Sequence, residues 1–232
     1  MSLSLRRTLA VFYKECKDAT KNKLIIMVFF MFPVLSFLFK YIMPETETRV
    51  ALPMFTNMNI IMVPIILMST IIAEEKEKGT LRVLIMSNVQ PMEYLIGIGF
   101  FVFIIAVIST ALFLITNNIE TTYIFLFLAT SLSGIICSIL IGAIIGLITK
   151  NQMSTGPLSG IIAMVLGMVP MFANMNNSIR NYSKYLYSQS VFDILFRIKD
   201  EFTLEKFTVI GVNALIFLII FYFIYKRKKL AD

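Results

Sequence analysis

Six apolar stretches, each long enough to cross a lipid bilayer, constrain this chain more than any other feature. A helix needs roughly 20 apolar residues to span a hydrocarbon core of about 30 Å, and it satisfies its own backbone hydrogen bonds in lipid. The sequence therefore predicts an all-α polytopic membrane protein, a single transmembrane domain over residues 1–232. The six predicted spans cover residues 24–43, 53–73, 92–116, 122–149, 157–174 and 207–225.

The composition supports this class and excludes several kinds of chemistry. Hydrophobic residues make up 58% of the chain and charged residues 15%, against about 25% charged in soluble domains. The chain has no histidine, which excludes Ser-His and Cys-His catalysis and the common zinc sites. It also lacks a G-x-x-x-x-G-K-[ST] phosphate-binding loop. We therefore expect no catalytic, cofactor-binding or metal-binding residues in this chain, and any ATP and Mg²⁺ would be bound by a partner subunit.

The distribution of charge predicts an orientation. Six spans place both termini on one side, together with the loop over residues 74–91. That side holds 14 of the 21 Lys and Arg residues against seven of the 14 Asp and Glu residues, so the opposite side has no net charge. Because basic residues are retained on the cytoplasmic side, we expect a multi-pass plasma-membrane protein with both termini in the cytoplasm.

Residues 1–23 have the pattern of an amphipathic helix. Apolar side chains recur at helical spacing at Leu5, Leu9, Phe12, Cys16 and Ala19, and lysines and arginines occupy the rest of the helical wheel. Such a basic amphipathic helix lies in the headgroup region and would lead into the first span as an elbow. The alternative is a charge cluster that only sets the orientation.

The loop after the second span is short, charged and sharply turned. Glu74 and Lys78 can pair one helical turn apart, Gly79 can end the helix, and Thr80 can cap a new short helix. The following leucines and isoleucine share one face, which predicts an apolar surface for a soluble partner; a solvated loop is the alternative. We expect the acidic residues to hold the loop to basic residues of the elbow or of that partner. The residues assigned to this site are Glu75, Glu77, Lys78, Gly79, Thr80, Leu81, Leu84 and Ile85.

Two further patterns lie within the spans. Small residues at four-residue spacing let helix backbones approach closely, so Gly134, Ser138, Gly142 and Gly146 predict a helix-packing face. Methionines recur at helical spacing on the second and fifth spans, and flexible thioethers suit a surface that accepts varied apolar ligands. A substrate pathway is one interpretation and ordinary packing the other. The candidate pathway residues are Met58, Met62, Met164, Met168 and Met171.

Residues 175–206 form an insertion before the last span. Val191, Leu195, Ile198 and Phe202 fall on one helical face, and Tyr182, Tyr185 and Tyr187 precede or begin it. Because tyrosines gather at membrane–water boundaries, we predict one or two short helices dipping into the outer leaflet. A surface cap with no role in transport is the alternative.

The arrangement as a whole resembles the permease subunits of type-2 ABC exporters. The most specific match is the run Glu75-Lys76-Glu77-Lys78-Gly79-Thr80, which resembles the family pattern E-[RK]-E-x-G-T after the second span. The resemblance implies that residues 74–91 contain a coupling helix docked in a separate ABC ATPase. It also implies that two permease subunits, identical or related, work as a dimer in the lipid membrane.

The compact size is similar to permeases that export amphipathic peptides, such as phenol-soluble modulin exporters. The resemblance thus implies ATP-driven export of a hydrophobic or amphipathic substrate, for example a cytolytic or antimicrobial peptide. Lipid or drug export is an alternative. Another is a channel, sensor or immunity protein that works without ATP. The basic surface is explained by topology and anionic lipid, so no nucleic acid partner is expected.

Overall fold

The computed structural model describes residues 4–19, 22–80, 86, 89–116, 119–198 and 204–227, and within these ranges all regular structure is helical. Six of the helices are long and apolar enough to cross a membrane. The prediction of an all-α polytopic membrane protein with six spans is therefore confirmed. In chain order the elements are α1 (Leu5–Ala19), α2 (Lys23–Ile42), α3 (Glu45–Glu77), α5 (Pro91–Thr116), η1 (Thr121–Tyr123), α6 (Ile124–Ile148), α7 (Gln152–Met175), α8 (Asn177–Ser183), α9 (Tyr187–Phe196) and α10 (Leu204–Arg227).

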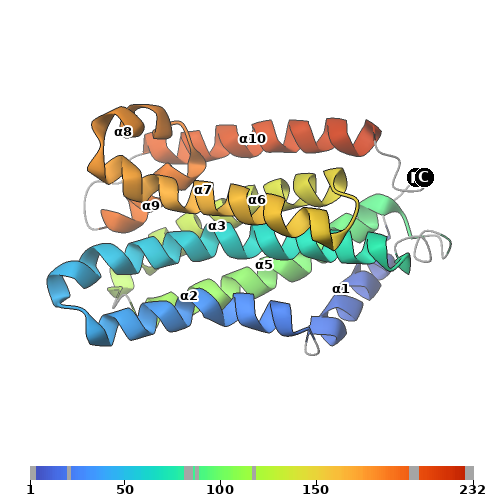
Figure 1. Ribbon diagram of the computed structural model, residues 1–232, viewed down its shortest axis with the longest axis horizontal. Coiled ribbons are helices and arrows are strands. Elements are labelled where there is room, and N and C mark those ends of the chain that lie inside the picture. Colours follow the sequence, from blue (N-terminus) through green and yellow to red (C-terminus); the bar gives the residue numbers. More distant parts are fainter. Residues whose placement is uncertain are drawn as a thin grey trace.

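Helix α3 is the centre of the bundle. It packs against α2, α5, α6, α7 and α9, and Figure 1 shows it running the length of the molecule between these helices. Its middle is fully buried, with Ile60, Ile61 and Val63 inaccessible to solvent. Helix α10 lies at the periphery on α6 and α9, and only Ile210 and Phe221 of its residues are buried. A displacement of α3 would therefore affect the packing of most of the molecule.

The small-residue face of α6 lies directly on α3. A β-carbon placed on Gly142 would be 2.8 Å from the carbonyl oxygen of Ile65, which is too close for any side chain. The same construction at Gly134 and Gly146 meets Ile60 at 2.7 Å and Ile72 at 2.9 Å. Ser138, the remaining member of the series, points to α9, with its Oγ 3.0 Å from the hydroxyl of Tyr187.

Two helices, α3 and α7, begin five or more residues before the predicted spans. Helix α3 starts at Glu45 rather than at residue 53, so its first turns extend beyond the apolar stretch. Helix α7 starts at Gln152 rather than at residue 157, because Asn151 and Ser154 form a capping box. The side chain of Asn151 accepts the backbone N–H of Ser154 at 3.0 Å. Such reciprocal caps satisfy backbone donors that the first turn leaves free.

The bundle has two distinct ends. Figure 1 places α1, the C-terminal end of α3 and the C-terminal end of α10 at one end, called the α1 end, and α8 and α9 at the other. Helix α1 crosses the start of α5, where Gly97 lies against the backbone of Thr8 and the side chain of Val11.

The predicted apolar face of α1 is divided between the surface and the bundle. Leu5 and Leu9 are exposed, whereas Phe12 packs on Phe100 of α5 with 5.2 Å between ring centroids, and Cys16 and Ala19 are partly buried. The position of α1 in the headgroup region stays a prediction.

Helix α9 is built into the bundle, and this corrects the placement of one tyrosine. Tyr182 and Tyr185 are exposed, as expected at a boundary, but Tyr187 is fully buried. Its ring packs on Phe217 of α10 with 5.9 Å between centroids. The reason is that α9 contacts α3, α6, α7 and α10, so both of its faces are covered. Val191 on the predicted apolar face is buried, whereas Phe202 lies outside the described residues.

Candidate functional site

The C-terminal end of α3 is a point where charged side chains of α1 and α3 meet. Residues Glu74, Glu75, Lys76 and Glu77 are consecutive, and helical geometry turns each about 100° from the one before. Each of the four side chains therefore points in a different direction. Each also contacts a different neighbour, and together these contacts join α3 to α1, α2, α6 and α7.

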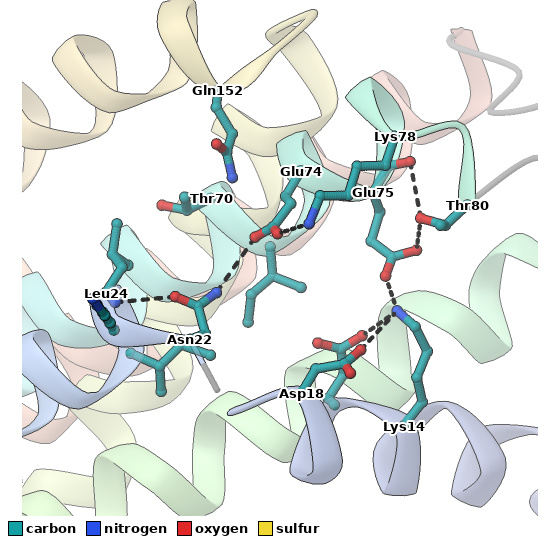
Figure 2. Close-up of a pocket in the computed structure, with 14 residues that line it drawn as sticks. Lys14, Asp18, Asn22, Leu24, Thr70, Glu74, Glu75, Lys78, Thr80 and Gln152 are labelled. Carbon is teal, nitrogen blue, oxygen red and sulfur yellow. Dashed lines mark hydrogen bonds and ion pairs between the residues drawn. The ribbon is translucent and has the colours of Figure 1, made fainter. Parts of the chain in front are cut away.

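Glu75 joins α3 to the elbow helix α1. Its side chain is buried, and its carboxylate forms an ion pair with the Lys14 ammonium and accepts the hydroxyl of Thr80 at 2.7 Å. Lys14 also lies 3.0 Å from Glu15 and 3.8 Å from Asp18 (Figure 2). One ammonium thus faces three carboxylates from two helices. Burial raises the pKa of the Glu15 carboxyl, and the neighbouring Lys14 only partly offsets this.

Glu74 joins α3 to the beginning of α2. The side-chain amide of Asn22 donates to Glu74 at 3.5 Å, while its oxygen caps α2 by accepting the N–H of Leu24 at 3.0 Å. The other oxygen of Glu74 pairs with Lys78, as the spacing predicts. This pairing raises the pKa of the Lys78 ammonium, because the hydrogen bond to the carboxylate favours the charged form.

Lys76 and Glu77 join α3 to the connection between α6 and α7. The Lys76 ammonium donates to the carbonyl oxygens of Gly146, Leu147 and Thr149 at 2.7, 2.9 and 3.1 Å. These carbonyls belong to the end of α6, where helical partners are missing and the dipole favours a cation. Glu77 accepts the backbone N–H of Gln152, the first residue of α7, at 3.0 Å. Its partner within the chain is therefore a helix N-terminus, and a contact with a basic residue of the elbow or of the ATPase stays a prediction.

Directly after this cluster the chain turns. Lys78 ends the helix and Gly79 has a φ of 68°, a conformation that side chains with a β-carbon rarely adopt. Thr80 folds back onto Glu75, and Met86 is 80% exposed. The three residues predicted to form the apolar surface of the coupling helix, Leu81, Leu84 and Ile85, lie outside the described residues.

The returning chain is anchored by a residue that the sequence analysis did not single out. Glu93, in the first turn of α5, is fully buried and accepts the backbone N–H groups of Ser4 at 2.6 Å and Gln90 at 2.9 Å. Arg7 of α1 lies 3.9 Å from the same carboxylate. The start of α5 is thereby held to the start of α1. An acidic residue in a first helical turn was the available signal.

An open polar cleft of about 620 Å³ lies between α1, α2 and α3, and the charged side chains of α1 and α3 line it. Figure 2 shows Lys14 and Asp18 on one wall, Asn22 and Glu74 on another, and Gln152 of α7 above them. Within the described part of the chain, no three His, Cys, Asp or Glu side chains are grouped so as to hold a metal ion. The arrangement is suited to holding helices together through charged contacts near water.

The model of the ABC-2 family of transporter proteins matches residues 48–225. The chain belongs to the ABC-2 family. It is therefore a permease subunit of an ABC transporter, a multi-pass membrane protein that is not itself catalytic. Among curated proteins, none matches its sequence. The family match begins within α3, so it includes the end of α3 but not Lys14 or the rest of the elbow helix.

The candidate pathway methionines of the permease are divided between two places. Met58 and Met62 on α3 face Gly167 of α7, where a β-carbon would meet Met62 at 3.4 Å. Met164 and Met171 lie on the surface of α7, 53% and 37% exposed. Met168 is partly buried. The structure thus brings the α3 methionines into the α3–α7 contact and leaves two of the α7 methionines on the outside.

The exposed face of α7 also contains small residues. Gly156 and Gly160 are four residues apart, and a β-carbon on either would meet no atom within 4 Å. Met164 continues the same face. A face of small residues at this spacing allows close approach of another helix in the membrane. Sequence analysis missed this pair, although the spacing is the same as that of the series on α6.

Proposed function

We propose that this permease exports a hydrophobic or amphipathic substrate, driven by a separate ABC ATPase that binds ATP and Mg²⁺. The observation that carries the proposal is the cluster at the end of α3. There the predicted coupling loop follows a helix whose last turn contacts α1, α2, α6 and α7. A force applied to the loop by a partner would reach all of these helices.

The charges at the same end of the molecule support an orientation in the membrane. Lys14, Lys76, Lys78, Lys226 and Arg227 all lie at the α1 end. The positive-inside rule therefore supports an α1 end in the cytoplasm, where an ATPase is available. In the proposed mechanism the apolar side chains Leu81, Leu84 and Ile85 dock into the ATPase, and Gly79 permits the turn that presents them.

Transmission through the cluster is supported by the way its contacts are made. Glu75 is buried on α3 whereas its partner Lys14 on α1 is about a third exposed. Hydrogen bonds to charged groups are each worth about 1.5–3 kcal/mol. The ATPase acts on the permease through several contacts, and the free energy that ATP binding and hydrolysis supply exceeds that of one such bond. The elbow could thus separate from α3 in one state of the cycle and return in the next.

A second permease subunit, identical or related, would pack against the exposed face of α7. Gly156 and Gly160 allow close approach, and Met164, Met168 and Met171 would then line a pathway between the two subunits. Met58 and Met62 lie behind Gly167 and would adapt to the substrate from α3. We propose an amphipathic peptide as the substrate, on the basis of the resemblance to small peptide exporters. Lipids and drugs are the competing substrates.

Substitution of Gly79 tests the coupling. In a reconstituted complex of permease and ATPase, Gly79→Val should retain ATP hydrolysis but lose export, because valine is strained at a φ of 68°. Gly211→Val is the matched control, since Gly211 lies on the exposed surface of α10 with no atom near its β-position. Both variants should insert into the membrane normally.

Two outcomes would overturn the proposal. One is export by the purified permease without ATP and an ATPase, which would favour a channel. The other is undiminished export by the Gly79→Val variant.

Comparing peptide, phospholipid and drug as stimulators of ATP hydrolysis in the same proteoliposomes identifies the substrate class. Stimulation by a lipid or a drug but not by an amphipathic peptide would reject the peptide assignment.

A further inference from the structure

A second cavity lies on a different side of the molecule from the charged cluster. It is a groove of about 520 Å³ formed by α5, α6 and α10, with Met68 of α3 at its floor. The hydroxyls of Tyr222 and Tyr225 are the only side-chain oxygen or nitrogen atoms of the residues that line it. Helix α7 contributes no lining residue, so the groove is separate from the proposed pathway.

The groove lies in the half of the bundle next to the α1 end, and its length matches one leaflet of a membrane. Its α5 wall runs from Met92 to Phe103, which is roughly 16 Å of helix at about 1.5 Å per residue. Half of a hydrocarbon core of about 30 Å is about 15 Å. The groove can therefore accommodate an acyl chain that runs parallel to the helices from the headgroup region inward.

The groove is open to the side. Ile96 and Phe100 of α5 are 44% and 48% exposed, and Tyr222 of α10 is 54% exposed. In a membrane this opening faces lipid and not water. A groove lined by apolar atoms offers water no hydrogen bonds, whereas an acyl chain recovers dispersion contacts along its whole length.

Basic residues stand where the groove reaches the membrane surface. Lys226 follows Tyr225 and lies one helical turn beyond Tyr222, and both Lys226 and Arg227 are exposed in the last turn of α10. The α5 wall contains one acidic residue, Glu93, which does not line the groove. Its carboxylate is fully buried and accepts N–H groups at the start of α1 and α5, so it does not oppose an anion at the opening.

We propose that this groove binds an anionic phospholipid of the leaflet at the α1 end. One acyl chain would fill the space between α5, α6 and α10, and the phosphate would lie at Lys226 and Arg227. The lipid would then complete the contacts of α10, the span with the fewest buried residues. This assignment depends neither on the direction of transport nor on the identity of the cargo.

The absence of tryptophan from the chain makes a direct test possible. Phe100→Trp places a single fluorophore in the groove, and Phe223→Trp places one on α10, 60% exposed and not among the lining residues. Each variant is reconstituted in phosphatidylcholine vesicles that contain brominated phosphatidylglycerol or brominated phosphatidylcholine. Preferential quenching of F100W by the anionic lipid is expected, with a relative affinity on the order of tenfold. F223W should be quenched equally by the two lipids.

Two further variants separate the headgroup from the acyl chain. Lys226→Gln with Arg227→Gln in the F100W background should abolish the preference for the anionic lipid. Gly99→Leu should fill the groove and weaken quenching by both lipids, because a β-carbon there meets only ordinary contacts, at 3.8 Å and beyond. Gly211→Leu, on the open surface of α10, is the matched control and should change neither.

Equal quenching of F100W by the two lipids would overturn the proposal and indicate ordinary boundary lipid. A preference that survives loss of both basic residues but is displaced by an exported peptide would also overturn it and assign the groove to cargo. Tyr222→Trp reports on the opposite wall of the groove and replaces F100W if that variant does not fold. Because neither measurement uses ATP, failure here leaves the proposed export function intact.

Discussion

The two ends of this permease hold their helices together by different means. At the α1 end, charged side chains from α1 and α3 pair with one another or with the termini of α6 and α7, and many of them are partly exposed. At the α8–α9 end, the short helix α9 is buried among four others, and its contacts are mainly aromatic packing and neutral hydrogen bonds, with one ion pair of 3.5 Å between Asp193 and Lys206 of α10. Charged contacts near water can separate and re-form at a small cost in free energy. A buried helix cannot separate from its close-packed neighbours at so small a cost.

This contrast suggests which part of the molecule moves. A bundle clamped at one end by α9 and joined at the other by exchangeable ion pairs would open more easily at the α1 end. That is also the end at which we propose the ATPase to act. Three predictions test the contrast, from the largest expected effect to the smallest.

The largest effect should come from the buried tyrosine of α9. Tyr187→Ala should lower the free energy of unfolding in detergent by about 3–5 kcal/mol, because it leaves a cavity against Phe217 and removes the partner of Ser138. Tyr182→Ala, at a position 82% exposed, should change it little. Equal effects of the two substitutions would contradict the picture of α9 as part of the core.

An intermediate effect is expected at the end of α3. Lys76→Met should cost about 1–3 kcal/mol, because three carbonyl oxygens at the end of α6 lose their shared donor. Lys78→Met is the control, since its exposed pair with Glu74 is worth at most about 0.5 kcal/mol. Chemical unfolding in detergent measures both variants. An equal loss of stability in Lys76→Met and Lys78→Met would show that the contact with the end of α6 contributes no more than an exposed ion pair.

The smallest effect concerns pH and the elbow. Burial holds the pKa of Glu15 above its ordinary value of 4.5, so the folded protein keeps a proton that the unfolded chain has lost. The docking of α1 should therefore weaken as pH rises from about 4.5 through the raised pKa, and stay constant above it. Amide hydrogen exchange of α1 measures this. Glu15→Gln should remove the pH dependence and slow exchange at neutral pH; faster exchange would show that the carboxylate is needed in its charged form.

Patterns confined to one helix could be predicted well, and contacts between helices could not. The pair of Glu74 with Lys78 and the turn at Gly79 depend only on neighbouring residues, and both are found where expected. Glu75 was expected to contact a basic residue of the elbow or of the partner, and the structure pairs it with Lys14 of the elbow. Nothing in the sequence indicated that Lys76, between two acidic residues, would reach the end of α6.

Tyr187 illustrates the same limit at the other end. Tyrosines near a predicted span usually lie at the membrane boundary, and two of the three are exposed, as that position requires. The third is buried because α9 turns inward between α3, α6 and α10, which is a property of how the helices are arranged. No local pattern distinguishes Tyr187 from Tyr185.

The length and apolar character of six segments determined by themselves that this chain is a helical membrane protein, because an isolated helix in lipid needs nothing beyond its own residues. The charged run after the second span likewise indicated the loop at which we expect a partner to bind. Only the tertiary structure decided which side chains of that run hold which helices, and where an apolar groove remains between α5, α6 and α10. Such contacts join residues far apart in the chain, and their distances depend on the packing of the whole bundle.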